Sequence, residues 1–572
     1  MGIEQYLRWK DARGKEFRPV SLDGLDLLND RILNKGTAFS KKERGEFYLR
    51  GLIPPRVQTF EEQLKRVYMG YQNTDTDIQK YIFLRSLQDR NETLFYALLS
   101  ENVEEMTPII YTPTVGKACQ EFSHRYQKAR GLYITRENVN RMNQMVNHFP
   151  SKDIKIIVVT DSQGILGIGD QGVGGMGIAI GKLSLYTLGA GIHPACCLPV
   201  TLDVGTDNEE LLNDPIYLGV PYKRIKGEEY YKFIKKFIRK VKYHFPNALL
   251  QWEDFSKSHA FNNLNDYTEI LPSFNDDIQG TGAMVFAGII NAARIKNEKI
   301  SDQVYAVYGA GAGGVGIANQ IYAGLIKEGL DRDEALNRIY VLDSMGLVFE
   351  NRDNLENYKK PFAKPPELAA KWAVEKPGKA SLTEVINNIP VTVLLGASGV
   401  GGSFCREHVG GMMKYTERPV IFPLSNPTDK CEALPEDLIK WSKGQAIIAT
   451  GSPFGDIVYG DKTFRIGQGN NVFIFPGVGL AAILAKTRVM TMDMFTTASF
   501  ALADCVSDSE LASGRIYPGI KELRKVSLNV ATEVIKKELR DQPDHHYLHE
   551  KNLEQYLEEC MWKPVYLPYR RV

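Results

Sequence analysis

Two pairs of adjacent carboxylates could hold a metal ion. Glu253-Asp254 and Asp276-Asp277 both lie among apolar and aromatic residues, and carboxylates in such surroundings need a counter-charge. Hard cations such as Mg²⁺ and Mn²⁺ take oxygen ligands. Successive side chains on a regular strand point to opposite faces, so Glu253 and Asp254 can share an ion only if the strand ends or twists there. Acidic pairs are more often surface residues, but the apolar flanks favour a metal site. The histidines and cysteines lack the ligand spacing of a zinc site.

A lysine and a tyrosine could supply the base and the acid for proton transfer. Lys182 ends a glycine-rich segment, and a lysine in a water-poor cleft near a cation has its pKa lowered, as a general base requires. Tyr111, between Ile110 and Pro113, could be a proton donor. By residue type alone, a surface lysine after a flexible loop and a half-buried tyrosine are the commoner interpretations. Composition and spacing therefore decide neither role.

Two segments match the glycine pattern G-x-G-x-x-G, Gly172–Gly177 and Gly309–Gly314. Only the second directly follows a predicted strand, Val304–Tyr308, and opens a segment with the apolar period of a helix. Glycines there allow a tight turn and a close approach of the backbone to a pyrophosphate at the helix N-terminus. We therefore predict a dinucleotide loop. Its residues are Gly309, Gly311, Ala312, Gly313 and Gly314.

Asp343 ends the next predicted strand and could bond the ribose hydroxyls. It lies farther past Gly314 than the usual ~20 residues, which implies a longer helix or an insertion. A carboxylate suits a free 2′-hydroxyl and repels a 2′-phosphate, but Ser344 is neutral and Lys359 and Lys360 follow downstream. NAD is slightly favoured over NADP.

The elements that must position these groups alternate between strand and helix. The chain up to about Gly131 has a mostly helical pattern, and Ile154–Thr160 predicts a buried strand. From Val304 onwards, apolar runs alternate with helix-compatible segments, which is typical of a doubly wound parallel sheet with ligands at the carboxyl ends of its strands. The runs are Val304–Tyr308, Ile339–Leu342, Val391–Leu395, Val420–Pro423 and Ala446–Ala449. The sequence predicts an α/β protein with a dinucleotide-binding domain, a second α/β domain and a helical N-terminal domain.

Bulk properties exclude several classes of function. The chain has 572 residues, 43% of them hydrophobic, and a formal net charge of +1, so several domains are expected and a nucleic-acid or membrane-surface partner is not. The seven cysteines have no C-x-x-C spacing, which favours reduced thiols. No apolar run is long enough to cross a membrane, and the N-terminus has neither a signal nor a transit pattern. We expect the cytoplasm, with mitochondria as the alternative.

With these segments in view, the chain closely resembles the malic enzymes from about residue 25 onwards. The ordered motifs make the resemblance specific at family level. They are Y-T-P-T-V-G (111–116), V-V-T-D (158–161), G-I-G-D-Q-G-V-G-G-M-G-I-A-I-G-K (167–182), L-D-V-G-T (202–206), W-E-D-F (252–255), F-N-D-D-I-Q-G-T-G (274–282), Y-G-A-G-A-G-G-V-G (308–316), P-L-S-N-P-T (423–428), A-T-G-S-P-F (449–454) and G-Q-G-N-N-V-F-I-F-P-G (467–477).

The resemblance implies oxidative decarboxylation of L-malate to pyruvate and CO₂ with NAD or NADP and Mg²⁺ or Mn²⁺. It implies that Tyr111 is the general acid and Lys182 the general base, which also contacts the substrate. The implied metal ligands are Glu253, Asp254 and Asp277, with Asp276 beside them. Asn426 and Asn471 match substrate-contacting asparagines, and Asp277 and Asn426 also border the cofactor.

The resemblance also implies four domains and a homo-oligomer, a tetramer built from dimers. The expected parts are a helical N-terminal domain (1–130), a central substrate and metal domain in two segments (131–275 and 471–540), a dinucleotide domain (276–470) and a C-terminal extension (541–572).

One position departs from the family. Many members carry an arginine after V-T-D that contacts the substrate carboxylate, and this chain has Gly164 there. A glycine at this position resembles the fungal mitochondrial malic enzymes and also the malolactic enzymes. The sequence of the turn at Gly174–Gly177 resembles the malic enzymes. The alternative is therefore a malolactic enzyme, which makes lactate with bound NAD. A catalytically silent dinucleotide sensor is a third hypothesis, but it has no reason to keep the three acids together.

Overall fold

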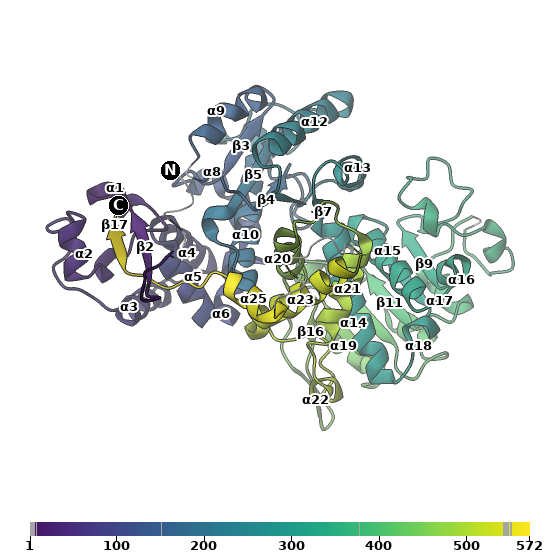
Figure 1. Cartoon of the computed structure of the whole chain (residues 1–572). Helices are drawn as coiled ribbons and strands as arrows, with labels where there is room; N and C mark the ends of the chain where they lie inside the picture. Colours follow the sequence, from purple (N-terminus) through teal and green to yellow (C-terminus); the bar gives the residue numbers. More distant parts are fainter. Residues whose placement is uncertain (1–5, 7–8, 150, 377, 542–547, 549–551) are drawn as a thin grey trace. The chain divides into compact units, whose positions relative to one another are not determined.

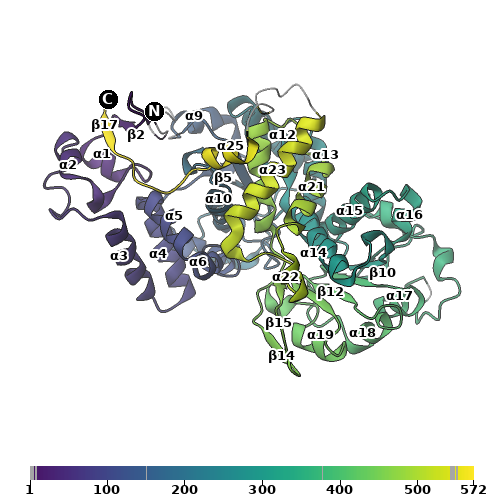
Figure 2. The same cartoon turned by 60° about the horizontal axis from the view of Figure 1, so that its bottom comes forward.

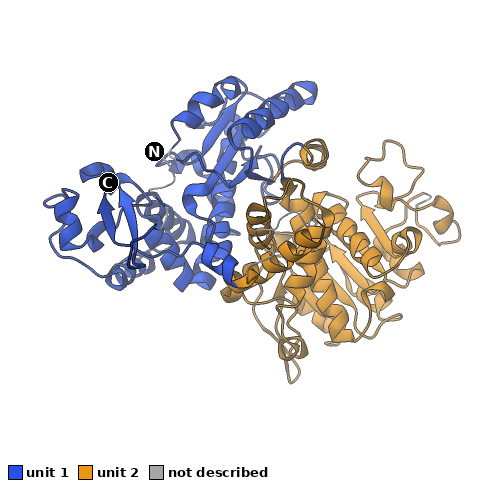
Figure 3. Ribbon diagram, in the orientation of Figure 1, with its two compact units in different colours: residues 1–253, 270–272, 555–572 blue, residues 254–269, 273–554 orange. Residues whose placement is uncertain are grey.

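The structure is a computed structural model that describes residues 6, 9–149, 151–376, 378–541, 548 and 552–572. Two compact units divide the chain (Figure 3). Unit 1 contains residues 1–253, 270–272 and 555–572, and unit 2 contains residues 254–269 and 273–554. The four-domain division expected from the sequence remains a prediction.

Unit 1 begins with short helices and a small sheet (Figure 1). Ser40–Glu43, Thr59–Glu62 and Thr76–Gln79 form capping boxes, which is why three of these helices begin where they do. The strand β17 (Tyr569–Arg571) pairs in parallel with β2 (Glu16–Val20), a contact that the sequence did not predict. The other elements are β1 (Trp9–Lys10), α1 (Gly24–Asn29), α2 (Lys41–Glu46), α3 (Phe60–Gln72), α4 (Asp77–Arg90), α5 (Glu92–Glu101), α6 (Val103–Ile110), α7 (Thr114–Gln120) and α8 (Phe122–Arg125).

A parallel sheet forms the second part of unit 1. The strands β3 (Leu132–Thr135), β5 (Cys197–Asp203), β4 (Ile156–Thr160) and β6 (Leu249–Trp252) are adjacent in that order. Every residue of β4 is buried, as its β-branched run predicted. The helix α10 (Met176–Ala190) packs on β4 and β5. Nearby helices are α9 (Met142–Asn147), α11 (Glu209–Asn213) and α12 (Gly227–His244).

The larger sheet of unit 2 has the predicted doubly wound topology. Its order is β10-β9-β8-β11-β12-β13-β16, and all neighbours are parallel except β10 on β9. The chain leaves β8 for β9 on one side and then returns to β11 on the other, so the strand order reverses between β8 and β11. The strands are β8 (Tyr305–Tyr308), β9 (Ile339–Asp343), β10 (Gly346–Leu347), β11 (Val393–Gly396), β12 (Val420–Pro423), β13 (Ile447–Thr450) and β16 (Gly467–Gln468). Such a reversal is where open α/β sheets bind ligands.

Helices surround this sheet and form a second layer. The helix α14 packs against α15 and α21, and α23 lies beside α20 and α21 (Figure 2). Between β8 and β9 the chain forms both α15 and α16, which accounts for the long spacing from Gly314 to Asp343. The helices are α13 (Lys257–Tyr267), α14 (Thr281–Lys296), α15 (Ala312–Lys327), α16 (Arg332–Asn337), α17 (Leu382–Asn388), α18 (Arg406–Met412), α19 (Pro435–Trp441), α20 (Phe475–Ala485), α21 (Met492–Ala503), α22 (Asp508–Ala512) and α23 (Leu523–Asp541).

The remaining elements are β7 (Ser273–Asn275), the hairpin of β14 (Ile457–Tyr459) and β15 (Lys462–Phe464), and α25 (Leu553–Cys560). None of the helices in the described residues is both long and apolar enough to span a membrane. All seven cysteines are free thiols, as their spacing predicted.

Candidate active site

Lys182 lies in the middle of the buried helix α10 and is not the surface lysine after a flexible loop that its residue type alone favoured. Its side chain is almost fully buried, and its Nζ lies 3.0 Å from Glu253 Oε1. The same ammonium is 5.3 Å from the centre of the Tyr111 ring. The predicted base, the predicted acid and one predicted metal ligand are therefore neighbours in unit 1.

Two sequence features bring Tyr111 to α10. The helix α6 ends at Ile110, and Pro113 favours an extended conformation for Thr112 before α7 begins at Thr114. Gly181 then allows the end of α6 to approach α10 closely, because a Cβ at position 181 would lie 3.1 Å from both Ile110 O and Tyr111 Cδ2. Tyr111 is buried beside Lys182 as a result.

A hydrogen-bond chain fixes the Glu253 carboxylate. Gln251 Nε2 donates to Glu253 Oε2 over 2.8 Å, and the Tyr186 hydroxyl donates to Gln251 Oε1. Because Tyr186 lies one turn after Lys182 on α10, the helix holds Glu253 both directly and through Gln251. Sequence reasoning missed Gln251 and Tyr186, since their types carry no functional signal.

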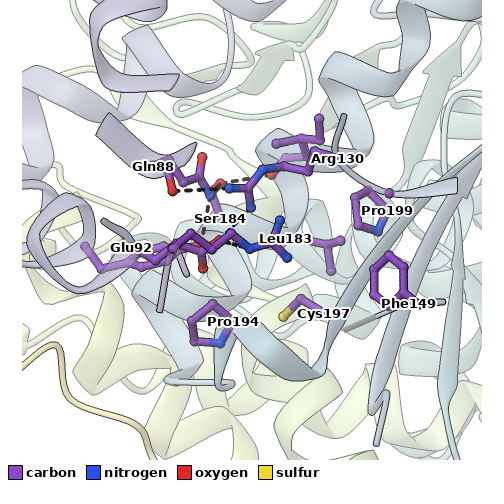
Figure 4. A pocket seen from close by; sticks show the side chains of 13 residues that line it. Gln88, Glu92, Arg130, Phe149, Leu183, Ser184, Pro194, Cys197 and Pro199 are labelled. Carbon is purple, nitrogen blue, oxygen red and sulfur yellow. Dashed lines mark hydrogen bonds and ion pairs between the residues drawn. The ribbon is translucent and has the colours of Figure 1, made fainter. Parts of the chain in front are cut away.

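A small polar cavity of about 20 Å³ lies against α10 and has room for about one water molecule. Figure 4 shows Gln88, Glu92 and Arg130 converging near Ser184. Gln88 Nε2 donates to Ser184 Oγ over 3.3 Å, and Arg130 Nη1 is 2.8 Å from Glu92 Oε1. This buried network braces the helix that carries Lys182.

The three predicted metal ligands lie together. The strand β6 ends at Trp252, and Asp254 has a φ of 55°, so the strand alternation that would separate Glu253 from Asp254 is broken. The Asp254 N–H donates to Asp277 Oδ2 over 2.9 Å. One oxygen of each of Glu253, Asp254 and Asp277 lies within 4.8 Å of the others. Opposite oxygens around an octahedral Mg²⁺ are about 4.2 Å apart, so these acids fit a Mg²⁺ or Mn²⁺ site.

Asp276 has a different partner from Asp277. The segment Asp276–Gly280 is a turn of π-helix that continues into α14. Asn471 Nδ2 donates to Asp276 Oδ2 and to Thr281 Oγ1, each over 3.0 Å. The predicted substrate-contacting Asn471 thus lies against Asp276, the carboxylate that was not predicted as a ligand.

The loop from Gly309 to Gly314 has the backbone that a dinucleotide loop needs. It follows β8 directly and leads into α15, with Gly311 as N-cap. Gly309 has a φ of 118°, and a Cβ on Gly314 would lie 1.6 Å from Gly309 O. Neither position can hold another residue without moving the backbone. Ala312 and Gly313 form the first turn of α15, where backbone N–H groups remain for an anion.

Asp343 ends β9 as predicted, but two cations already contact it. Arg352 Nη1 is 2.8 Å from Oδ1, and Lys359 Nζ is 3.0 Å from Oδ2. Partial burial raises the pKa of the Asp343 carboxyl, but hydrogen bonds from these cations and from a backbone N–H outweigh it and hold the pKa below its ordinary value. The carboxylate is therefore ionised and its charge is balanced locally.

The ends of β11 and β12 are tied together by Glu432, which sequence reasoning missed. Its fully buried carboxylate accepts hydrogen bonds from Ser398 N and Oγ, both over 2.8 Å, and from Ser425 Oγ over 2.5 Å. Asn426, which follows Ser425 in the chain, accepts a 2.6 Å hydrogen bond from Ser452 Oγ at its Oδ1. Glu432 thereby fixes the conformation of the segment that carries Asn426, a predicted substrate contact.

Gly164 lies half-buried in the turn after Asp161. Arg224 holds this turn, with Nε 2.7 Å from Asp170 Oδ2 and Nη2 donating to Asp161 O over 2.6 Å. Burial lowers the pKa of the Arg224 guanidinium, but the two carboxylates outweigh burial and raise it further. Arg224 therefore fixes the turn that contains Gly164 through its Nε and Nη2.

Family models and curated relatives match most of the chain. A family model described as "Malic enzyme, N-terminal domain" matches residues 88–268, and one described as "Malic enzyme, NAD binding domain" matches residues 278–539. The NAD-dependent malic enzyme of Proteus mirabilis is 46% identical over 95% of this chain and 96% of its own. The enzyme of that name from Pectobacterium carotovorum is 45% identical over 97% and 98%.

Solved structures share the fold. The crystal structure of malic enzyme from Pyrococcus horikoshii aligns with a TM-score of 0.52 at 24% identity, covering 80% of this chain and 88% of that one. The Entamoeba histolytica malic enzyme aligns with a TM-score of 0.52 at 20% identity, over 86% and 95%.

Proposed function

The chain belongs to the malic enzyme family, and we propose that it oxidises and decarboxylates L-malate to pyruvate and CO₂, with NAD as hydride acceptor and Mg²⁺ or Mn²⁺. One observation carries the assignment of residues: the buried Lys182 ammonium lies 3.0 Å from Glu253 Oε1. Glu253 is followed in the chain by Asp254, which is hydrogen-bonded to Asp277. A base next to a carboxylate metal ligand is the arrangement that metal-assisted oxidation of a hydroxy acid requires.

Lys182 and Tyr111 carry the proton transfers in this proposal. When bound in the glycine loop Gly309–Gly314, NAD would supply a hydride acceptor, and a divalent cation held by Glu253, Asp254 and Asp277 would supply Lewis-acid stabilisation of negative charge. Lys182, acting as the neutral amine, removes the proton of the C2 hydroxyl. Oxidation at C2 must precede loss of the C4 carboxylate because only a β-keto acid has an electron sink. Tyr111 then protonates C3. The 5.3 Å between the Lys182 ammonium and the Tyr111 ring supports return of the abstracted proton through Tyr111.

In this proposal, the remaining predicted residues bind the metal ion, the substrate and the dinucleotide. We assign Glu253, Asp254 and Asp277 as metal ligands, and Asn426 and Asn471 as substrate contacts. The loop Gly309–Gly314 receives the pyrophosphate at the start of α15. Asp343 bonds the adenosine ribose, which supports NAD, as do the names of the curated relatives.

A product assay tests the function. With L-malate, NAD and Mn²⁺, absorbance at 340 nm should rise, and pyruvate should form in equal amount to NADH. Formation of lactate without net NADH would identify the malolactic alternative, which the relatives' names disfavour. Parallel assays with NADP give the ratio of kcat/KM for the two dinucleotides, and we expect NAD to be preferred.

The proposed assembly is inferred from the family resemblance, and the proposed location from the sequence. We propose a homo-tetramer built from dimers, located in the cytoplasm. Light scattering on the purified protein should give four times the chain mass of 64.3 kDa, and a mass of one chain at micromolar concentration would contradict the assembly.

A further inference from the structure

Two pairs of side chains join the helix α10 to the strand β6 and its end. Lys182 and Tyr186 lie four residues apart on one face of α10, and Gln251 and Glu253 lie two residues apart on one side of the strand. Four helical residues rise about 6.0 Å and two strand residues about 6.6 Å. Because these spacings match, Tyr186 reaches Gln251 where Lys182 reaches Glu253.

The contact between Tyr186 and Gln251 has a fixed direction. An ionised carboxylate only accepts hydrogen bonds, so the amide nitrogen of Gln251 must face Glu253, and Nε2 donates to Glu253 Oε2 over 2.8 Å. The amide oxygen then faces Tyr186, whose hydroxyl donates to it. Tyr186 and Gln251 are fully buried, so the amide cannot turn over without leaving buried polar groups unpaired.

These contacts hold both oxygens of the Glu253 carboxylate. Oε1 lies 3.0 Å from the Lys182 ammonium, and Oε2 accepts from Gln251. A carboxylate held at both oxygens is not free to rotate so that both oxygens face one ion. Ca²⁺ accepts such bidentate carboxylates in flexible shells, whereas Mg²⁺ and Mn²⁺ take octahedral shells. A fixed Glu253 therefore favours the smaller ions.

We propose that Gln251 and Tyr186 are positioning residues for the divalent cation. They hold Glu253 as a ligand through one oxygen, which strengthens binding of Mn²⁺ and Mg²⁺ and disfavours the larger Ca²⁺. This inference rests on the proposed function, because it takes Glu253 as a metal ligand. Hydrogen-bond partners that orient a metal ligand change metal affinity by about 10- to 100-fold when they are removed.

The test measures metal binding in the absence of malate and dinucleotide. Free Mn²⁺ is followed by electron paramagnetic resonance during a titration, and Ca²⁺ is then added as a competitor. In Gln251→Met, which keeps the side-chain volume and removes the amide, we expect Kd for Mn²⁺ to rise about 10- to 100-fold. Kd for Ca²⁺ should rise less, so that the ratio of Kd for Ca²⁺ to Kd for Mn²⁺ falls at least about fivefold. Tyr186→Phe should raise Kd for Mn²⁺ about 2- to 10-fold, as expected for the loss of one buried hydrogen bond.

Two further variants separate this role from a general loosening of α10. Because Tyr186 acts through Gln251, the double variant should bind Mn²⁺ within about twofold of Gln251→Met alone. The matched control is Tyr96→Phe. Tyr96 is also a buried tyrosine whose helix packs on α10, but its hydroxyl accepts from Gln88 Nε2 and lies outside the chain to Glu253. Tyr96→Phe should keep the native affinity for Mn²⁺.

Three outcomes would overturn the inference while leaving the proposed function intact. They are native Mn²⁺ affinity in both Gln251→Met and Tyr186→Phe, equal weakening of Mn²⁺ and Ca²⁺ binding, and the same loss of affinity in Tyr96→Phe. Melting temperatures report on folding, and if Gln251→Met does not fold, Tyr186→Phe alone decides. Failure of the proposed function is different, because the native protein would then bind Mn²⁺ without oxidising malate.

Discussion

At the scale of single residues, the site depends on a buried pair of opposite charges. Lys182 and Glu253 are each almost fully buried and lie 3.0 Å apart. Removing one partner of such a pair leaves the other charge buried, which costs more than the pair itself contributes. The pair therefore fixes the position of the base. A hydrogen bond from Gln251 also orients the carboxylate of Glu253, a proposed metal ligand.

Lys182→Ala should lower kcat by about 10²–10⁴-fold, the range for loss of a general base. The measurement is steady-state turnover of malate with saturating NAD and Mn²⁺. A matched control is Ser184→Ala, which removes a neighbouring polar group of the same helix and should retain most activity. Near-native turnover of Lys182→Ala would exclude it as the base.

Tyr111→Phe should separate oxidation from protonation. Because Lys182 remains, the first turnover should still produce NADH rapidly in stopped-flow absorbance at 340 nm, whereas steady-state kcat should fall about 10²-fold. Tyr186→Phe provides the contrast: it removes the hydroxyl that positions Glu253 through Gln251, so it should slow the first-turnover NADH formation and the steady-state kcat together. A loss of the first-turnover NADH in Tyr111→Phe would contradict its assignment as the acid of the second half-reaction.

At the scale of elements, strand ends and helix starts position the groups. The apolar runs predicted β8, β9, β11, β12 and β13 to within two residues of the observed strands, because a buried parallel strand needs an unbroken apolar segment. The sequence did not predict the left-handed backbone at Asp254. It indicated only that the strand must end or twist there if Glu253 and Asp254 share an ion. Glu432 could not be predicted, since its role depends on serines that belong to two different strand ends.

Glu432→Ala should release the segments after β11 and β12 from each other. Its carboxylate accepts hydrogen bonds from the half-buried Ser398 and the buried Ser425, and a buried Ser425 donor left without a partner costs about 1–3 kcal/mol. We expect KM for NAD and for malate to rise together, and the melting temperature to fall by several degrees. Glu432→Gln keeps one acceptor oxygen and should recover most of the affinity. Native KM values in Glu432→Ala would show that these segments hold their shape without it.

At the scale of the whole molecule, segments distant in sequence complete each unit. In unit 1, Lys35 Nζ lies 2.5 Å from Glu43 Oε1 and donates to Leu567 O over 2.6 Å. Burial lowers the pKa of Lys35 to about 8, against the opposing effect of Glu43. The aromatic tail after about residue 540 gave no sequence signal for this role, because pairing of β17 with β2 depends on contacts across nearly the full chain.

Deleting residues 564–572 should destabilise the small sheet of unit 1 and spare the active-site chemistry. The deletion removes β17, the buried Tyr569 and the carbonyl that accepts from Lys35, so amide exchange across β2 should quicken markedly while kcat stays within about 3-fold. Lys563→Ala, at an exposed position beside the deletion, is the control. Unchanged exchange in β2 would contradict a structural role for β17.

In the proposed mechanism, Glu253, Asp254 and Asp277 hold one divalent cation beside Lys182. The most direct measurement is an electron paramagnetic resonance titration of Mn²⁺ into the native protein and into Asp277→Asn, with Asp276→Asn as the neighbouring control. We expect one Mn²⁺ per chain in the native protein and a bound Mn²⁺ in Asp276→Asn. In Asp277→Asn we expect at least about tenfold weaker binding, together with loss of malate oxidation. Native Mn²⁺ affinity in Asp277→Asn would contradict this mechanism.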